Sequence, residues 1–285
     1  MTIKEIVIIS GKGGTGKTTL TASLVPYLEN IVIADCDVDA PDLHILLDPE
    51  IRSRENFVGL KKAVVDLSAC THCMACVDSC KFDAISDSII INGMKCEGCG
   101  VCEYVCPSEA IAMKDTVVGT VFHADTTYGP MVHARLIPGE ETSGKLVSLV
   151  RNEAKKEAEI KGLGTILIDG SPGIGCNVIS SITGAEKVII VTEPTMSGLH
   201  DLSRVFDITD RFSGKVFVVI NKFNLSREMS IKIEQESKKR GSEVLLKIPF
   251  DKRMVKAITD KKIPSLAEKE LFSEAGFEEF VKRIT

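Results

Sequence analysis

The chain has 285 residues, of which 44% are apolar and 26% are charged, and this composition excludes a disordered protein. Its longest apolar runs, such as residues 6–9 and 188–191, are far shorter than the roughly 20 residues needed to span a bilayer. The net charge of −5, without a strongly basic block, does not favour nucleic acid or a membrane surface as a partner. We therefore expect a soluble protein with one large domain, or one large and one small.

Short β-branched runs alternate with helix-forming stretches at both ends of the chain. The first run is typical of a buried parallel strand and not of a signal peptide, so we expect a cytoplasmic protein. Strands are predicted at residues 3–10, 31–35, 165–169, 187–192, 215–221 and 243–248. Helices are predicted at residues 17–29, 145–161, 199–212, 227–240 and 271–284. This alternation predicts a doubly wound, mostly parallel α/β sheet with ligands at the carboxyl ends of its strands.

A cysteine-rich segment of different composition interrupts the alternation, which indicates an inserted domain. We assign residues 1–58 and 116–285 to the α/β domain and residues 59–115 to the insert. Residues 117–137 alternate between apolar and polar side chains and contain the turn-forming sequence Tyr-Gly-Pro. We predict that they form a β-hairpin leading back to the α/β domain.

Residues 11–18 read GKGGTGKT, which matches the phosphate-loop pattern G-x-x-x-x-G-K-[ST] between a buried strand and a helix. The glycines let backbone N–H groups surround phosphates, Lys17 supplies a cation, and the Thr18 hydroxyl is a magnesium ligand. A similar stretch at residues 139–146, GEETSGKL, has two glutamates and a final leucine that suit neither phosphate nor magnesium. We predict one ATP site, formed by Gly11, Lys12, Gly13, Gly14, Thr15, Gly16, Lys17, Thr18 and Thr19.

The early lysine, Lys12, makes this loop similar to the variant phosphate loop K-G-G-x-G-K-T-T of the MinD/ParA/Mrp group of ATPases. That group includes the nitrogenase iron protein. The resemblance covers the chain outside the cysteine-rich segment and implies a P-loop ATPase fold. It also implies that Lys12 reaches the nucleotide of a partner subunit, so that ATP and Mg²⁺ bring two copies together as a homodimer.

The resemblance implies roles for carboxylates that follow two of the strands. Asp37 matches the residue that orients the attacking water, and Asp35 lies near magnesium in this comparison. Residues 166–173 resemble Walker B and switch II, so that Asp169 would hold magnesium through water and Gly173 would sense the γ-phosphate. A polar strand end without catalytic function is the alternative. We expect a magnesium site of Thr18, Asp35 and Asp169, and catalytic roles for Lys12, Lys17 and Asp37.

Two further positions resemble the family's adenine contacts. Asn221, at the end of a predicted strand, matches the asparagine that recognises adenine, and Pro249 belongs to the turn that packs on the base. Each signal is weak alone, because an asparagine after a strand is also a common turn residue. We include both residues in the expected ATP site.

Eight of the ten cysteines form two identical runs, C-x2-C-x2-C-x3-C, and each cysteine of the second run follows its counterpart by 26 residues. The same offset relates Ala84-Ile85 to Ala110-Ile111, which indicates an internal duplication. This spacing is typical of bacterial ferredoxins, in which the fourth cysteine of each run binds the other cluster. We predict a small α+β ferredoxin-like insert with two 4Fe-4S clusters, one held by Cys70, Cys73, Cys76 and Cys106 and the other by Cys80, Cys96, Cys99 and Cys102. Two structural zinc ions are the alternative, but zinc sites usually lack this third cysteine.

The remaining cysteines and the histidines give no metal site. Cys36 lies in a strand end and is expected in the core. Cys176 is near the position of one cluster-binding cysteine of the nitrogenase iron protein, but the second such cysteine has no counterpart here. We expect Cys176 to be a small apolar residue, and we assign no ligand role to the five histidines.

An ATPase that carries two clusters could use them in two ways. In the first, ATP hydrolysis is coupled to low-potential electron transfer to an unidentified redox partner. In the second, an Mrp-type ATPase assembles clusters or delivers them to an acceptor protein. We favour the first, because each predicted cluster is fully ligated and the C-x-x-C pair of Mrp-type carriers is absent. A positioning protein on membrane or nucleoid would need a basic amphipathic segment, whereas residues 271–284 are weakly acidic.

Overall fold

The structure is a computed structural model that describes residues 3–140 and 143–285. The chain forms two compact units. The larger unit comprises Met1–Glu55, Val121–Arg135 and Ser143–Thr285, and the smaller unit comprises Asn56–Thr120 and Leu136–Thr142. Strands β3 (Glu50–Val58) and β6 (Val117–Thr126) carry the chain from one unit to the other. In the part of the chain described, no helix has the length and apolar character required to cross a membrane.

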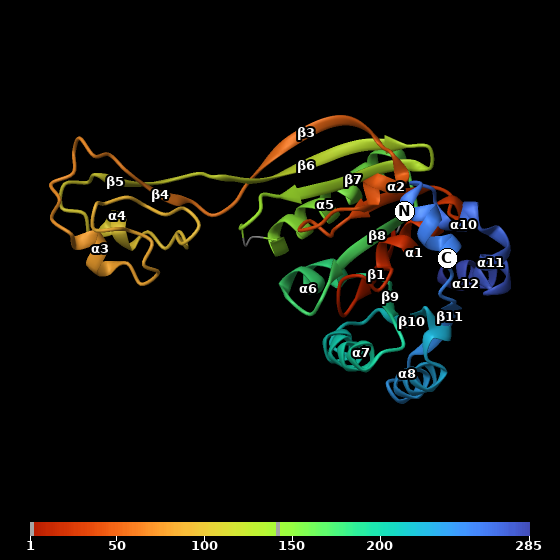
Figure 1. The fold of residues 1–285 in the computed structure, drawn as a ribbon. Helices are drawn as coiled ribbons and strands as arrows, with labels where there is room; N and C mark the ends of the chain where they lie inside the picture. The colour runs from red at the N-terminus through yellow and green to blue at the C-terminus, as the bar shows by residue number, and fades with distance from the viewer. Residues whose placement is uncertain (1–2, 141–142) are drawn as a thin grey trace. The chain divides into compact units, whose positions relative to one another are not determined.

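The large sheet has the strand order β11-β10-β9-β1-β8-β2-β7-β6-β3 (Figure 1). Its other strands are β1 (Lys4–Ser10), β2 (Ile31–Asp35), β7 (Gly129–Leu136), β8 (Thr165–Pro172), β9 (Lys187–Thr192), β10 (Lys215–Asn221) and β11 (Glu243–Ile248). Neighbouring strands from β11 through β7 are parallel. The predicted mostly parallel α/β sheet is therefore confirmed, and only β8 extends well beyond its predicted end.

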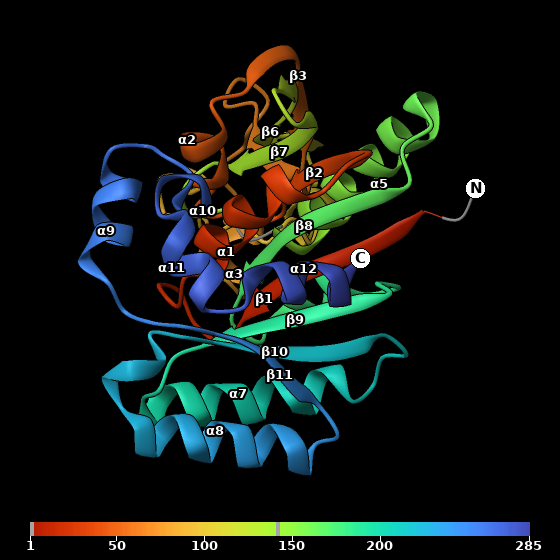
Figure 2. The same cartoon turned by 90° about the vertical axis from the view of Figure 1, so that its right-hand side faces the viewer.

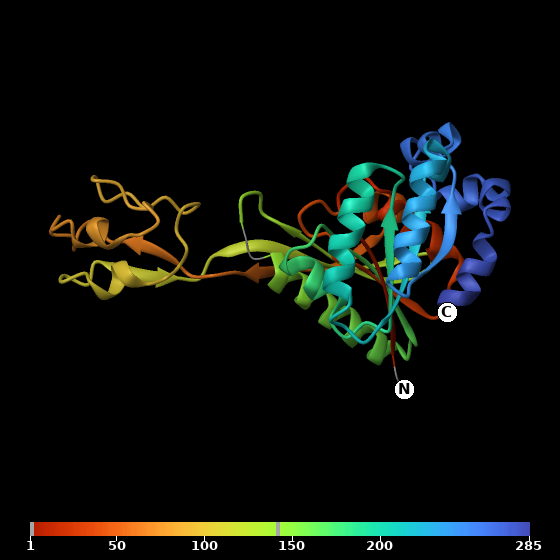
Figure 3. The ribbon, with the colours of Figure 1, turned by 90° about the horizontal axis from the view of Figure 1, so that it is seen from below.

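Both faces of this sheet are buried, which explains the β-branched strand interiors. Ile6 and Ile8 of β1 pack in a core with α1 (Lys17–Leu24), α2 (Leu43–Leu47) and the C-terminal helices. Val7 and Ile9 are equally buried and point to the opposite face, because side chains alternate along a strand. Helices α5 (Ser143–Lys161) and α6 (Cys176–Ile182) pack on β8, whereas α7 (Met196–Thr209) and α8 (Arg227–Lys239) lie side by side on the strands at the β11 end (Figure 3).

Two predicted helices end early for local reasons. The first stops at Leu24 and continues as a short 3-10 turn, η1 (Val25–Tyr27), because Pro26 cannot donate the next helical hydrogen bond. The C-terminal segment forms two helices and not one, since Gly276 adopts a left-handed φ of 79° between them (Figure 2). The remaining elements of the larger unit are η2 (Phe223–Leu225), α9 (Lys252–Thr259), α10 (Pro264–Ala267), α11 (Lys269–Glu274) and α12 (Phe277–Ile284).

Strands β6 and β7 are joined by a tight turn. The Thr126 hydroxyl donates to the Gly129 carbonyl at 2.8 Å and accepts hydrogen bonds from the Tyr128 and Gly129 amides. Gly129 is tightly enclosed, because a Cβ there would lie 2.5 Å from the Ile31 carbonyl oxygen. The turn thereby fixes β7 against β2, its parallel neighbour.

The smaller unit repeats its own backbone. Strands β4 (Lys62–Val65) and β5 (Ile111–Lys114) pair antiparallel, and helices α3 (Ala75–Ser79) and α4 (Val101–Tyr104) begin 26 residues apart. The left-handed residues follow the same spacing and form the pairs His72 and Gly98, Met74 and Gly100, and Asp83 and Glu109. The duplication seen in the sequence is therefore also a duplication of conformation.

Candidate functional site

The phosphate loop connects the end of β1 to the start of α1. Gly14 and Gly16 have left-handed φ values of 78° and 96°, which glycine adopts without steric penalty. A pocket opens over this loop, at the carboxyl ends of the parallel strands where ligands of such sheets bind. Its lining consists of Ser10, Gly13, Gly14, Thr15, Gly16, Lys17, Thr18, Thr19, Asp37, Asp39, Ala40, Asp42, Pro172 and Asn177.

Lys17 is buried among carboxylates at the base of this pocket. Its Nζ lies 3.0 Å from Asp169 Oδ1 and 3.3 Å from Asp37 Oδ2. Burial by itself lowers the pKa of Lys17, but the charges of Asp169, Asp37 and Asp35 outweigh it and raise that pKa above its usual value. The lysine is therefore a cation, held where a phosphate would compete with the carboxylates for Lys17 and a metal ion would compete with Lys17 for the carboxylates.

Asp169 is the centre of a hydrogen-bond network with α1. The hydroxyl of Thr18 donates to Asp169 Oδ2 at 2.7 Å, and that of Thr21 donates to Oδ1 at 2.9 Å. Two of the predicted magnesium residues, Thr18 and Asp169, are therefore in direct contact. Thr21 was not predicted, although its position one helical turn after Lys17 could have indicated it.

The third predicted magnesium residue, Asp35, lies deeper. It is fully buried and accepts hydrogen bonds from the backbone amides of Asp37, at 3.0 Å, and Leu43, at 3.3 Å. Burial and the nearby Asp169 charge raise its pKa well above the usual range. In this structure Asp35 holds the 36–43 loop in place, and that loop carries Asp37 to the pocket.

Asp37 lines the pocket and faces Lys17. Burial raises its pKa, an effect that Lys17 opposes and Asp169 reinforces. Gly173, in the segment after β8, has a left-handed φ of 99° and donates its amide to the Ser10 carbonyl at 2.8 Å. The predicted water-orienting residue and the predicted γ-phosphate sensor thus both lie next to the phosphate loop.

Asn221, at the end of β10, supports the phosphate loop. Its Nδ2 donates to the Thr15 carbonyl at 2.8 Å, and its Oδ1 accepts from the Lys222 amide at 2.9 Å. A Cβ at Gly16 would lie 2.2 Å from that Nδ2, so the contact is close. Asn224, which was not predicted, pairs twice with the backbone of Phe250 and so ties the turn containing Pro249 to the end of β10.

We expect Asn221→Ala to weaken ATP and GTP binding by a similar factor, about 5- to 20-fold, because the loop loses a buried hydrogen bond worth about 1–2 kcal/mol. Titration calorimetry with both nucleotides measures this. A loss confined to ATP would instead support adenine recognition by Asn221. Asn152→Ala is the matched control, since Asn152 is exposed on α5 and does not line the pocket, so both affinities should stay unchanged.

The two lysines of the phosphate loop, Lys12 and Lys17, have different partners. Lys12 is not part of the pocket lining and pairs with Glu193 and Ser197, two residues that sequence analysis missed. Glu193 directly follows β9, and the general rule that ligand-binding residues follow parallel strands could have singled it out. Gly11 is closely packed, since a Cβ there would lie 2.6 Å from Asp201 Cβ.

The cysteines of the smaller unit form no disulfide with one another, and several of them lie close together. Burial raises the pKa of Cys76, and the neighbouring Cys106 and Cys70 raise it further. Burial likewise raises the pKa of Cys102, with further contributions from Cys96 and Cys99. Cys106 belongs to the other run from Cys76 and Cys70, as crossed ligation requires, whereas Cys96 and Cys99 belong to the same run as Cys102. The two ligand sets stay a prediction.

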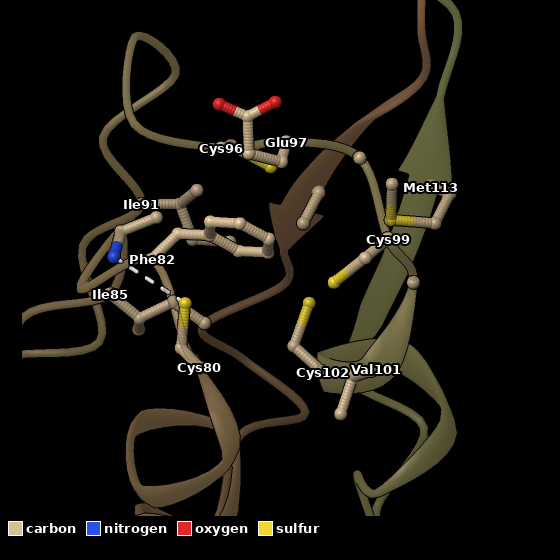
Figure 4. Close-up of a pocket in the computed structure, with 14 residues that line it drawn as sticks. Cys80, Phe82, Ile85, Ile91, Cys96, Glu97, Cys99, Val101, Cys102 and Met113 are labelled. Atoms are coloured by element: carbon tan, nitrogen blue, oxygen red, sulfur yellow. Dashed lines mark hydrogen bonds between the residues drawn. The ribbon is translucent and has the colours of Figure 1, made fainter.

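One of these groups lines a pocket of its own. Figure 4 shows the thiols of Cys80, Cys99 and Cys102 turned toward a common space. The walls are mainly apolar and include Ala63, Phe82, Ile85, Ile91, Cys96, Val101 and Met113. Amide-to-sulfur hydrogen bonds repeat with the duplication: Ala84 donates to Cys80 Sγ at 3.4 Å and Ala110 donates to Cys106 Sγ at 3.3 Å.

No three or more His, Cys, Asp or Glu side chains within residues 3–140 and 143–285 come together as ligands of a single metal ion. Cys36 is fully buried beneath α5, as expected, and its Sγ lies 4.0 Å from the Val147 carbonyl. Cys176, by contrast, is exposed at the start of α6, and the expectation that it has no ligand role stays a prediction.

A family model described as the CobQ/CobB/MinD/ParA nucleotide-binding domain matches residues 6–264, which is most of the chain. The protein belongs to the CobQ/CobB/MinD/ParA family. The resemblance carried by Lys12 and its loop is thereby confirmed at the level of this family of nucleotide-binding ATPases.

Relatives of this CobQ/CobB/MinD/ParA family member include an uncharacterised protein of Methanocaldococcus jannaschii, 33% identical over 263 residues, or 91% of this chain and 89% of the relative. The septum site-determining protein MinD of Thermotoga maritima is 26% identical over 76% of this chain and 64% of its own length. MinD structures from Aquifex aeolicus and, with Mg-ADP, from Pyrococcus horikoshii share the fold, with TM-scores of 0.57 and 0.56 at 20% identity. They cover 99% and 100% of this chain, and 96% and 95% of their own chains.

Proposed function

We propose that this protein is a cytoplasmic, ATP-hydrolysing iron-sulfur protein that forms a homodimer on ATP and couples hydrolysis to low-potential electron transfer. The observation that carries the proposal is the presence, in a chain of this ATPase family, of two four-cysteine groups related by an internal duplication. Its partners would be a second copy of itself and a redox protein. Neither nucleic acid nor membrane enters the proposal, because the chain has a net charge of −5 and lacks a strongly basic block.

The phosphate-loop residues suit the hydrolysis of ATP. Lys17 would exchange its contacts with Asp37 and Asp169 for the β- and γ-phosphates, while a magnesium ion at Thr18 and Asp169 would replace the positive charge beside those carboxylates. Asp37 is then free to orient a water toward the γ-phosphate. Phosphoryl transfer depends mainly on positioning and charge, and these side chains supply both. The solved MinD of Pyrococcus horikoshii contains Mg-ADP, which supports this use of the pocket.

The cysteines of the smaller unit fit two 4Fe-4S clusters, which supply one-electron transfer at low potential when bound. Cys70, Cys73, Cys76 and Cys106 would hold one cluster, and Cys80, Cys96, Cys99 and Cys102 the other. Among the described residues no three such side chains are placed as ligands of one ion, so the proposal rests on the eight cysteines and their repeated spacing. Apolar walls and amide donors to sulfur are the surroundings that stabilise such thiolate ligands.

The proposed ligand sets supply four cysteines from this chain to each cluster. Four cysteines for each cluster leave no open coordination position, which favours electron transfer over delivery of the cluster. Delivery to an acceptor protein, as in Mrp-type ATPases, is the second candidate. The surface position of Cys176, outside both groups, favours neither function.

The test is an anaerobic redox titration of both clusters by electron paramagnetic resonance, with and without MgATP, in an Asp37→Ala variant that retains bound ATP. We expect MgATP to shift at least one cluster potential, because coupling between two sites is reciprocal. A shift of about 59 mV would correspond to a tenfold preference of MgATP for one redox state. Unchanged potentials and line shapes, together with cluster transfer into an apo-protein, would replace electron transfer by cluster delivery.

A further inference from the structure

Lys12 is held by an acidic side chain of its own subunit. Its Nζ lies 2.7 Å from Glu193 Oε1 and donates to Ser197 Oγ at 2.8 Å. Glu193 follows β9, the strand next to β1 in the sheet, and Ser197 lies in the first turn of α7. The lysine that distinguishes this phosphate loop is therefore bound to the neighbouring strand end and not to the pocket.

The second oxygen of Glu193 is also occupied. Lys222 Nζ lies 3.1 Å from Glu193 Oε2 and donates to the Gly14 carbonyl at 3.3 Å. Glu193 is therefore shared by two lysines, Lys12 of the phosphate loop and Lys222 after β10. Burial opposes ionisation of Glu193, but the hydrogen bonds from Lys12 and Lys222 prevail and lower its pKa below the usual value. The carboxylate is consequently charged at neutral pH.

The two halves of this contact differ in freedom of movement. The Glu193 side chain is 15% exposed, and its turn is rigid, because a Cβ at Gly198 would lie 2.2 Å from the Glu193 carbonyl oxygen. The Gly198 amide also donates to Thr195 Oγ1 at 2.9 Å. Lys12 is 32% exposed and is carried by a glycine-rich loop. Glu193 is the fixed half of the pair, and Lys12 is the half that can move.

We propose that Glu193 is a positioning residue that latches Lys12 within the free subunit and so opposes dimerisation. The inference rests on the proposed function, in which Lys12 contacts the nucleotide of the partner subunit. One ammonium group cannot pair with Glu193 and also reach phosphates across a dimer interface, so closure requires release of the latch. Lys222 remains on Glu193 after release and keeps the carboxylate neutralised.

Symmetry amplifies the effect of the latch. A homodimer contains two Lys12 residues, and both must leave Glu193 before both nucleotides are contacted. Each latch therefore contributes the same factor, and the dimer dissociation constant changes by the square of the factor per subunit. If one partly exposed ion pair changes the equilibrium of its subunit by about threefold, two of them change the dimer dissociation constant by about tenfold.

Glu193→Gln tests the latch, because glutamine keeps the shape and one acceptor oxygen but removes the charge. We expect its dimer dissociation constant in MgATP, measured by analytical ultracentrifugation in the Asp37→Ala background, to fall about tenfold. ADP affinity of the monomer should stay within about twofold, since Lys12 serves the partner's nucleotide. Ser197→Ala, which removes the other contact of Lys12, should strengthen the dimer by a smaller factor and serves if Glu193→Gln folds poorly.

The matched control is Glu234→Gln, which breaks a 2.6 Å ion pair with Lys247 away from the loop and should leave dimerisation unchanged. An Asp37→Ala protein that stays monomeric in MgATP would contradict the proposed function itself. If the Asp37→Ala protein dimerises and the addition of Glu193→Gln leaves this tendency equal or weaker, the latch is overturned. A large loss of ADP affinity in Glu193→Gln would overturn it too, since that result assigns Glu193 to support of the loop.

Discussion

Lys17→Ala is expected to lower the affinity for MgATP by at least about 100-fold, which corresponds to about 2.7 kcal/mol. The ammonium group lies within 3.3 Å of the buried Asp169 and of Asp37, which lines the pocket, and the variant leaves these charges uncompensated where the phosphates must bind. Titration calorimetry measures the affinity, and iron analysis of the same sample should find the iron content unchanged. Retained ATP affinity would refute the assigned phosphate loop.

Two further variants separate binding from folding in that experiment. Lys17→Arg keeps a cation between Asp37 and Asp169, so it should fold even if the alanine variant does not. It should still bind MgATP poorly, because the planar guanidinium group of arginine is larger than the ammonium group that the loop encloses. Lys247→Ala removes a half-exposed lysine far from the pocket and should bind normally. Poor binding by the Lys247 variant would point to general damage and not to the loss of Lys17.

Cys99→Ser is expected to remove one of the two clusters and to leave the ATPase unit folded. Iron content should fall from about eight to about four atoms per chain, because each cluster takes four cysteines. MgATP affinity and the unfolding of the larger unit, followed by circular dichroism, should be unchanged. Global unfolding would contradict the independence of the two units, and unchanged iron would contradict the assigned ligand group.

Cys176→Ser is the control for this experiment. Cys176 is also exposed, but it belongs to the larger unit and to neither cysteine group. Its replacement should leave all iron in place. Loss of iron from this variant would assign Cys176 to a cluster and would require a different set of ligands from the one proposed.

Local sequence predicted those parts of the site that are made from consecutive residues. The glycines, Lys17 and Thr18 of the phosphate loop belong to one stretch, so a pattern identifies them. The two cysteine runs could be recognised because an offset of 26 residues relates them, and their division into two ligand groups stays a prediction. The strands of the parallel sheet were also predictable, since burial on both faces demands continuous β-branched runs.

Contacts that depend on strand order were not accessible in the same way. Glu193 reaches Lys12 only because β9 lies next to β1, and Asn221 reaches Thr15 only because β10 follows β9 in the sheet. The sequence places both residues at strand ends but does not state which strands are neighbours. The break between α11 and α12 is a different case. Gly276 can be read from the sequence, but its left-handed conformation, which ends the helix, cannot.

Strands β3 and β6, which carry the chain between the units, are the outermost pair of the large sheet. The strands that carry the phosphate loop, Asp37 and Asp169 lie further inside, and each is paired on both sides. An ancestral chain could therefore have gained the cysteine-rich segment by lengthening two border strands, without reordering any strand that holds a catalytic side chain. Length added at this border of the sheet leaves the pairing of the inner strands unchanged.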